Sequence, residues 1–173
     1  MRDERPVKVF IFHMKQDDPK KCTAAKLFRL HLARPVFRLS NIPAGAVVLN
    51  PVADQILTRK DRIIVEREGL VAIDCSWERA DQVFERSFPG VNRRLPLLLA
   101  GNPTNYATLS KLSSLEAIAA ALYITGFKAQ ARRLLSIFKW GSTFSSLNEE
   151  PLKEYSRAED LGKIVELERS FFH

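Results

Sequence analysis

The chain has 173 residues, of which 46% are hydrophobic, and its formal net charge is +7 at pH 7. This length and composition suit one or two small domains with a packed core, and they exclude a chain that is disordered throughout. No apolar run reaches the ~18–20 residues that cross a bilayer, and Cys22 and Cys75 provide neither a disulfide framework nor a CxxC pair, so we expect a cytoplasmic protein without a membrane partner.

In chain order, the first half alternates between short apolar runs and helical patterns. The runs predict five strands of a length that suits burial on both faces of a parallel sheet: Val7–Phe12, Pro35–Arg38, Ala46–Leu49, Leu70–Asp74 and Leu95–Leu99. Helices are predicted between them at Thr23–Leu32, at Val52–Arg59 with a continuation after Asp61, and at Glu78–Phe88. This alternation predicts an α/β domain with right-handed crossovers.

The second half has a helical pattern. Ser113 and Glu116 fit a capping box at the start of a helix that Gly126 would end. Further helices are predicted around Ala131–Phe138, after Trp140-Gly141, and from Leu161 to the C-terminus. We therefore expect an α/β domain over residues 1–92 and a mainly helical domain over residues 93–173, packed into one unit.

Positive charge is concentrated near the start of the chain. Between residues 8 and 38 there are eight lysines and arginines and two acidic residues, and eight minus two leaves +6. Neutralising phosphates with such a segment releases counterions, so the charge favours a nucleic-acid partner. A solvated basic surface is the alternative, and charge alone does not separate RNA from DNA.

Most familiar catalytic motifs are absent from the sequence. It contains no GxGxxG, Walker A, HExxH or GxSxG pattern, and its three histidines are scattered without ligand spacing, so no metal site is expected. Attention therefore turns to the loops that follow the predicted strands, because open α/β sheets bind ligands at the carboxyl ends of their strands.

Two of these loops carry residues that could bind a ligand or take part in a reaction. The run Asp74-Cys75-Ser76-Trp77 offers a carboxylate and an aromatic wall, and Asp74 would bind a ribose hydroxyl or accept a proton. The alternative is that Asp74 caps the next helix and Trp77 fills the core. The run from Asn102 to Tyr106 predicts a rigid polar turn, for which a purely structural role is the alternative.

Several motifs, in order, resemble those of a known family. They are Asp74-Cys75-Ser76-Trp77; Arg94-Leu95-Pro96-Leu97-Leu98-Leu99-Ala100 with Asn102-Pro103 and Asn105-Tyr106; Leu115-Glu116-Ala117-Ile118-Ala119-Ala120; and Phe138-Lys139-Trp140-Gly141 with Phe144 and Asn148. The series covers nearly the whole chain and is similar to that of the small-subunit ribosomal RNA aminocarboxypropyltransferases. The resemblance implies an S-adenosylmethionine-binding fold like that of the SPOUT methyltransferases, including a deep trefoil knot.

The resemblance also implies a reaction. The γ-carbon of the methionine moiety would be attacked by N3 of a modified uridine, of the pseudouridine type, in small-subunit ribosomal RNA, and methylthioadenosine would leave. S-adenosylmethionine would serve as substrate, and no metal is implied. The partner would be the RNA or a pre-ribosomal particle, and the protein would be a monomer.

Roles for individual residues follow from the same resemblance. Trp77 would form a wall against the sulfonium methyl, and Asp74 would be either the catalytic base for the uridine N3 proton or a ribose ligand. The implied contacts to S-adenosylmethionine are Thr23, Leu49, Pro51, Ile73, Trp77, Leu97, Leu112, Glu116 and Ala120. The expected contacts to RNA are Lys15, Lys20, Lys21, Lys26, Lys60, Arg62 and Arg94.

Two other functions stay open at the level of the sequence. One is an S-adenosylmethionine-dependent RNA methyltransferase of the SPOUT type, which a bulky wall at Trp77 would oppose and which would usually be a dimer. The other is a non-catalytic ribosome assembly factor that binds RNA by charge and has no affinity for S-adenosylmethionine.

Overall fold

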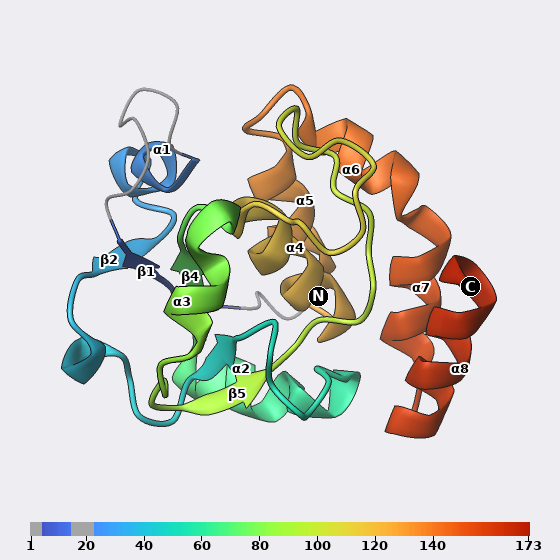
Figure 1. Ribbon diagram of the computed structural model, residues 1–173, viewed down its shortest axis with the longest axis horizontal. Helices are drawn as coiled ribbons and strands as arrows, with labels where there is room; N and C mark the ends of the chain where they lie inside the picture. Colours follow the sequence, from blue (N-terminus) through green and yellow to red (C-terminus); the bar gives the residue numbers. More distant parts are fainter. Residues whose placement is uncertain (1–4, 15–22) are drawn as a thin grey trace.

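A parallel five-stranded sheet forms the centre of the computed structural model, which describes residues 5–14 and 23–173. The strands lie in the order β2-β1-β4-β3-β5 (Figure 1). Their bounds are β1 Val9–His13, β2 Arg34–Val36, β3 Val47–Leu49, β4 Leu70–Asp74 and β5 Val91–Arg93. The expected α/β class with a five-stranded parallel sheet is therefore confirmed.

The pairing of β1 with β4 determines which side chains meet at the carboxyl ends of these two strands. The two strands run in register from Val9 opposite Leu70 to His13 opposite Asp74. Apolar side chains anchor this register, and Ile11 and Leu70 are fully buried. Because parallel strands end at the same edge, His13 and Asp74 are brought side by side at the carboxyl end of the sheet.

Helices cover both faces of the sheet. On one face, α1 (Thr23–Arg29), α2 (Arg62–Glu68) and α4 (Ser114–Ile124) contribute to the larger apolar core. On the other face, α3 (Ala80–Phe84) contributes Val83 and Phe84 to a second, smaller core. In Figure 1, α3 lies in front of the sheet and α4 behind it.

The central helix α4 has the start that the sequence predicted. The Ser113 side chain accepts from the Glu116 backbone N–H, and the Glu116 carboxylate accepts from the Ser113 backbone N–H, which forms a capping box. Gly126 follows the helix with φ 97°, a left-handed conformation that glycine adopts readily. The helix packs against β4, α1, α5 and α7, so it is buried on nearly all sides.

Four more helices complete the second half of the chain. They are α5 Lys128–Leu135, α6 Gly141–Leu147, α7 Glu149–Arg157 and α8 Leu161–Phe172. In Figure 1, α7 and α8 lie side by side at one end of the molecule. Within residues 5–14 and 23–173, no helix combines the length and apolar character needed to cross a bilayer.

The predicted strand Leu95–Leu99 is wrong. The fifth strand is Val91–Arg93, which pairs with β3. Side chains from the second half of the chain hold the backbone of residues 97–99 instead. Asn148 bonds both the N–H and the C=O of Leu99 at 2.8 Å, and the Tyr155 hydroxyl donates to the Leu97 carbonyl at 2.9 Å. Pro96 and Leu98 are buried, and the three leucines at 95, 97 and 99 are half-buried. The hydrogen-bond partners of residues 97–99 are Tyr155, Ser110 and Asn148, and none of them belongs to β3.

The predicted helix Val52–Arg59 is also wrong. Asn50 accepts from the Val52 N–H in a turn, and the following chain pairs with Arg94, through a bridge at Ile56 and a hydrogen bond from the Leu57 N–H. The helix begins later, after a capping box between Thr58 and Asp61, and α2 then runs to Glu68.

Candidate active site

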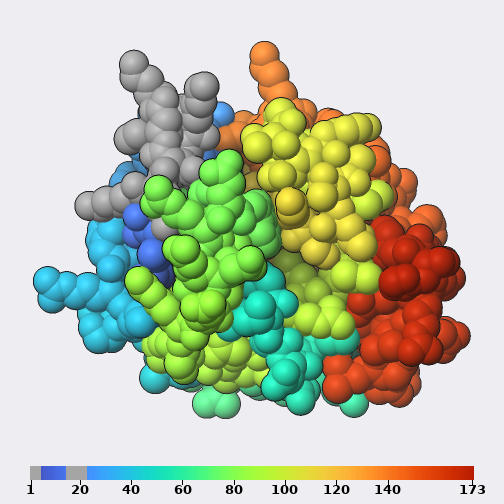
Figure 2. All heavy atoms as spheres, viewed as in Figure 1, coloured from blue at the N-terminus to red at the C-terminus, as the bar shows by residue number. Residues whose placement is uncertain are grey.

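A cavity of about 1140 Å³ opens at the carboxyl ends of the strands. Its walls come from the ends of β3 and β4 with the residues that follow them, from the segments 94–97, 102–105 and 110–114, and from four single residues, Thr23, Phe84, Ala117 and Trp140. In Figure 2 the surface is hollowed between α3, the yellow segment 100–112 and the cyan segment around residue 55. This is the position at which open α/β sheets bind ligands.

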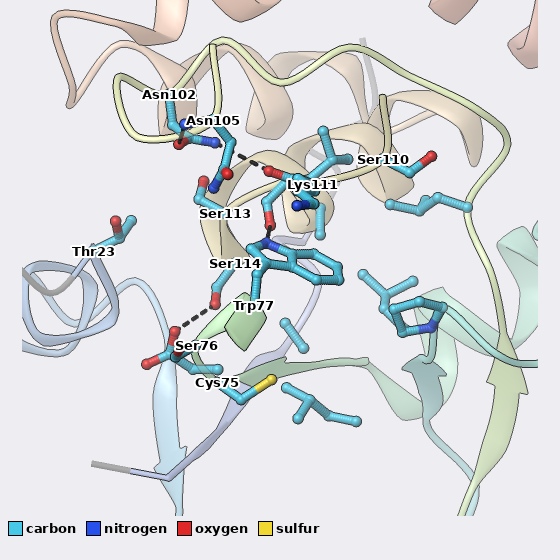
Figure 3. A pocket seen from close by; sticks show the side chains of 18 of the residues that line it. Thr23, Cys75, Ser76, Trp77, Asn102, Asn105, Ser110, Lys111, Ser113 and Ser114 are labelled. Atoms are coloured by element: carbon cyan, nitrogen blue, oxygen red, sulfur yellow. Dashed lines mark hydrogen bonds between the residues drawn. The ribbon is translucent and has the colours of Figure 1, made fainter. Parts of the chain in front are cut away.

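The cavity gathers most of the predicted S-adenosylmethionine contacts and also Asp74. Those that line it are Thr23, Leu49, Pro51, Ile73, Trp77, Leu97 and Leu112. Glu116 and Ala120 are fully buried in α4 and lie behind the wall. In Figure 3, Trp77 lies in the middle of the cavity, Asn102 and Asn105 lie above it, and Thr23 lies to the left.

Trp77 ties two walls of the cavity together. It begins the 3-10 turn Trp77–Arg79 after β4, and Ser76 caps that turn by accepting from the Glu78 N–H. Its indole Nε1 donates to the Leu112 carbonyl at 3.1 Å (Figure 3). A partly exposed indole ring is thereby fixed across the cavity and presents an aromatic face to a ligand.

Asp74 is held by two donors. One carboxylate oxygen lies 2.9 Å from His13 Nδ1, and the other accepts from the Ser114 hydroxyl at 2.9 Å. The imidazole is itself fixed by edge-on contacts with Phe28 and Phe37, at ring-centroid distances of 5.6 and 6.2 Å. The carboxylate lines the cavity, so its oxygens face the space that a ligand would occupy.

His13 was missed by reasoning from the sequence. Its spacing from the other histidines carries no metal signal, and Asp74 is 61 residues away. The available signal was that Asp74 ends one predicted strand and His13 directly follows another. Which strands are neighbours in a sheet is set by the tertiary fold, so this signal was insufficient without the strand order.

Glu116 braces the cavity from behind. Its side chain is fully buried, and it accepts from the Gly101 N–H at 2.6 Å, from Asn102 Nδ2 at 2.6 Å and from the Ser113 N–H at 2.9 Å. The Asn102 Oδ1 in turn accepts from the Asn105 N–H at 3.0 Å. One carboxylate therefore fixes the turn that begins at Gly101 relative to the start of α4.

An apolar end of the cavity is formed by Leu49, Pro51, Leu95 and Leu97. The Tyr155 hydroxyl supports it from behind through its bond to the Leu97 carbonyl. Burial raises the pKa of Tyr155 above its ordinary value, and the nearby Glu168 carboxylate raises it further, so the hydroxyl stays a donor.

The predicted RNA-binding residues are spread over several surfaces. Lys26 donates to the Ile137 carbonyl and lies 4.7 Å from the centre of the Phe138 ring. Arg62 donates to the Thr125 carbonyl, Arg94 pairs with Glu168 at 3.2 Å beside the cavity, and Lys60 is exposed. Lys15, Lys20 and Lys21 lie outside the described residues.

Comparison with protein families gives two matches. Residues 47–172 match a model described as "Ribosome biogenesis protein, C-terminal". Residues 7–37 match a model described as "Possible Fer4-like domain in RNase L inhibitor, RLI". That second segment contains one cysteine, Cys22, which is too few to ligate an iron–sulfur cluster.

Individual relatives cover almost the whole chain. The 16S rRNA aminocarboxypropyltransferase of Methanosarcina mazei is 43% identical over 169 residues, which is 96% of each chain. That of Thermoplasma acidophilum is 48% identical over 167 residues, covering 95% of this chain and 98% of the relative. The solved structure of the SAM-dependent rRNA:acp-transferase Tsr3 from Vulcanisaeta distributa matches with a TM-score of 0.84 and 40% identity, covering 95% of this chain and 97% of that one.

The fold is thus that of a class of S-adenosylmethionine-dependent transferases. This is the enzyme class, and S-adenosylmethionine is the substrate, that the resemblance in the sequence implied. Within that class, the chain belongs to the 16S rRNA aminocarboxypropyltransferase family.

Proposed function

We propose that this chain transfers the 3-amino-3-carboxypropyl group of S-adenosylmethionine to N3 of a modified uridine of the pseudouridine type in small-subunit ribosomal RNA, releasing methylthioadenosine. The observation that carries the proposal is the position of Trp77. It stands between an apolar end of the cavity and a polar end that includes Asp74 and Ser114.

The apolar end suits adenine, and the polar end suits the methionine moiety. Leu49, Pro51 and Leu97 would contact the adenine ring, with backbone groups near Leu97 and Leu112 at its polar edge and Ile73 near the ribose. Thr23, at the start of α1, would hold the methionine carboxylate with its hydroxyl group. Glu116 and Ala120 would act on the site from behind, because they are buried in α4.

Trp77 would set which carbon of the sulfonium reacts. An indole face against the methyl group shields that carbon from the acceptor and leaves the propyl chain accessible. The positive sulfonium beside the ring also gains about 1 kcal/mol of cation–π attraction. Since the sulfonium is an activated leaving group, catalysis needs mainly the positioning of the two substrates.

Asp74 is our candidate for the catalytic base. It would take the N3 proton, the N3 lone pair would form the new bond to the γ-carbon, and the electrons of the broken C–S bond would leave on sulfur. His13 and Ser114 support this role because they fix both oxygens of the carboxylate. The ribose-ligand role remains the competing assignment for the same residue.

We further propose a SPOUT-like trefoil knot and a division into residues 1–92 and 93–173. The strand order and the return of α4 against β4 and α1 after β5 support this topology. The second part would complete the cavity, to which it contributes residues 94–97, 102–105, 110–114 and Trp140.

The proposed partner is small-subunit ribosomal RNA or a pre-ribosomal particle, bound by a cytoplasmic monomer. The basic residues Lys15, Lys20, Lys21 and Lys26 precede or lie in α1, which delivers Thr23 to the cavity. Lys60, Arg62 and Arg94 would add contacts outside this segment, because lysine and arginine side chains that neutralise phosphates contribute much of the affinity for nucleic acid.

Analysis of the small-molecule product tests the proposal. The protein would be incubated with 16S rRNA and S-adenosylmethionine, and the products separated by chromatography. Methylthioadenosine is the expected product. S-adenosylhomocysteine would establish the methyltransferase alternative, and the absence of both with intact RNA binding would favour an assembly factor.

A further inference from the structure

The cavity has lining residues beyond those proposed to contact S-adenosylmethionine. Its volume of about 1140 Å³ exceeds the range of roughly 300–1,000 Å³ that is typical of sites for a single small molecule. The contacts proposed for S-adenosylmethionine leave part of the lining unassigned, and this part includes the turn at residues 102–105 and Trp140.

The turn presents a fixed amide group to this region. Asn102 is locked by Glu116 and by the Lys111 carbonyl, and it accepts from the Asn105 backbone N–H. The side-chain amide of Asn105 lines the cavity and has no hydrogen-bond partner among the described residues. Figure 3 shows this side chain pointing from its loop into the cavity. A half-buried amide on a braced loop is preorganised to meet a polar ligand.

Trp140 supplies an aromatic surface on the same cavity. It directly precedes α6, and its ring lies 5.2 Å from the Phe138 ring at an interplanar angle of 33°. The contacts of Lys26 with Ile137 and Phe138 join this segment to α1, whose Lys26 and Arg29 belong to the basic stretch between residues 8 and 38. A nucleic-acid backbone bound along α1 would therefore lie close to Trp140.

On these grounds we propose that Asn105 and Trp140 form the subsite for the acceptor nucleoside, flipped out of the RNA and placed beside S-adenosylmethionine. Trp140 stacks on the base. Asn105 Nδ2 donates to a ring carbonyl oxygen, where negative charge accumulates when N3 loses its proton to the base of the site. Extrusion of the target base and stacking on aromatic side chains are general solutions for chemistry on a nucleobase.

This inference rests on the proposed function, so its test measures three quantities for each variant. They are the affinity for S-adenosylmethionine, the affinity for 16S rRNA with methylthioadenosine bound, and the rate of aminocarboxypropyl transfer. The variants are Trp140→Ala, Trp140→Phe and Asn105→Asp. The matched control is Asn41→Asp, an exposed asparagine in the 3-10 turn Leu39–Asn41.

We expect Trp140→Ala to lower RNA affinity and kcat/KM by roughly 5- to 100-fold, the cost of losing one stacked base. Trp140→Phe keeps a ring and should retain most of both. Asn105→Asp should lower transfer by about 100-fold, because it replaces a donor at a developing negative charge with an acceptor. Affinity for S-adenosylmethionine should stay within about threefold of wild type in all variants.

The outcomes separate this inference from the proposed function. Unchanged RNA affinity and transfer in Trp140→Ala and Asn105→Asp would overturn the subsite, as would a loss that is matched by weaker S-adenosylmethionine binding. If the wild type shows no transfer, the proposed function fails and the acceptor subsite, which rests on it, fails with it. Transfer by the wild type together with a selective loss in Trp140→Ala relative to Asn41→Asp upholds the subsite.

Discussion

His13 Nδ1 and the Asp74 carboxylate lie 2.9 Å apart at the carboxyl ends of two neighbouring parallel strands, and both side chains are largely buried. The strand register creates this pair, since His13 and Asp74 are the last matched residues of β1 and β4. With Ser114 on the other oxygen, the carboxylate is held in one orientation at the cavity wall.

Substitution of Asp74 by asparagine tests the role of the carboxylate. An amide keeps the shape but loses the basicity, so we expect kcat for transfer to fall by about 10²–10⁴-fold. The affinity for S-adenosylmethionine, measured by calorimetry, should change by less than about threefold. Asp54→Asn, at an exposed position, serves as the control. A parallel loss of S-adenosylmethionine affinity would instead assign Asp74 to the ribose.

His13→Ala removes one of the two donors that orient Asp74. Small displacements of a reacting group carry large kinetic costs, so kcat should fall by about 10- to 100-fold while S-adenosylmethionine still binds. His173→Ala, at the exposed C-terminus, provides a matched histidine control. The positioning role is contradicted if His13→Ala transfers at the wild-type rate, or if the loss is explained by a lowered Tm at the assay temperature.

Trp77→Ala should weaken S-adenosylmethionine binding and loosen its reaction specificity. The variant loses the aromatic face and the hydrogen bond to the Leu112 carbonyl, and we expect a 5- to 50-fold loss of affinity. Trp77→Phe retains an aromatic ring without the N–H, so its affinity for S-adenosylmethionine should lie between those of wild type and Trp77→Ala. Equilibrium titration with S-adenosylmethionine measures the effect. If Trp77→Ala bound S-adenosylmethionine as tightly as wild type, Trp77 would not be a contact of this ligand.

Glu116→Gln should destabilise the fold, because the carboxylate accepts three N–H donors in a fully buried position. The glutamine amide would place its NH₂ group against one of these N–H donors, which should lower the free energy of unfolding by about 2–3 kcal/mol. For a chain of this size that corresponds to a fall in Tm of roughly 5–10 °C in a thermal melt. Glu166→Gln, whose side chain is 71% exposed, should melt within about 1 °C of wild type. A Tm of Glu116→Gln as high as that of Glu166→Gln would contradict the role of Glu116 in bracing the turn.

The sequence predicted those features that depend on local patterns. The capping box of Ser113 and Glu116 and the four strands from β1 to β4 follow from residue type and spacing. The contacts of Glu116 with Gly101 and Asn102 did not follow, because they join segments that meet only in the tertiary fold.

The errors have the same physical origin. Leu95–Leu99 has the composition of a strand, and the side chains that satisfy its backbone, Asn148 and Tyr155, lie about 50 residues further along the chain. Likewise, the loop at Val52–Arg59 is extended because Ile56 and Leu57 pair with Arg94. Local propensity was outweighed in both places by tertiary partners.

Aminocarboxypropyl transfer is tested by following two labelled positions of S-adenosylmethionine separately into RNA. Wild-type protein would be incubated with 16S rRNA and S-adenosylmethionine that is labelled either in the carboxyl carbon or in the methyl group. We predict that label enters the RNA from the carboxyl carbon and not from the methyl group. Entry of the methyl label would contradict it and would show that Trp77 does not shield the methyl carbon.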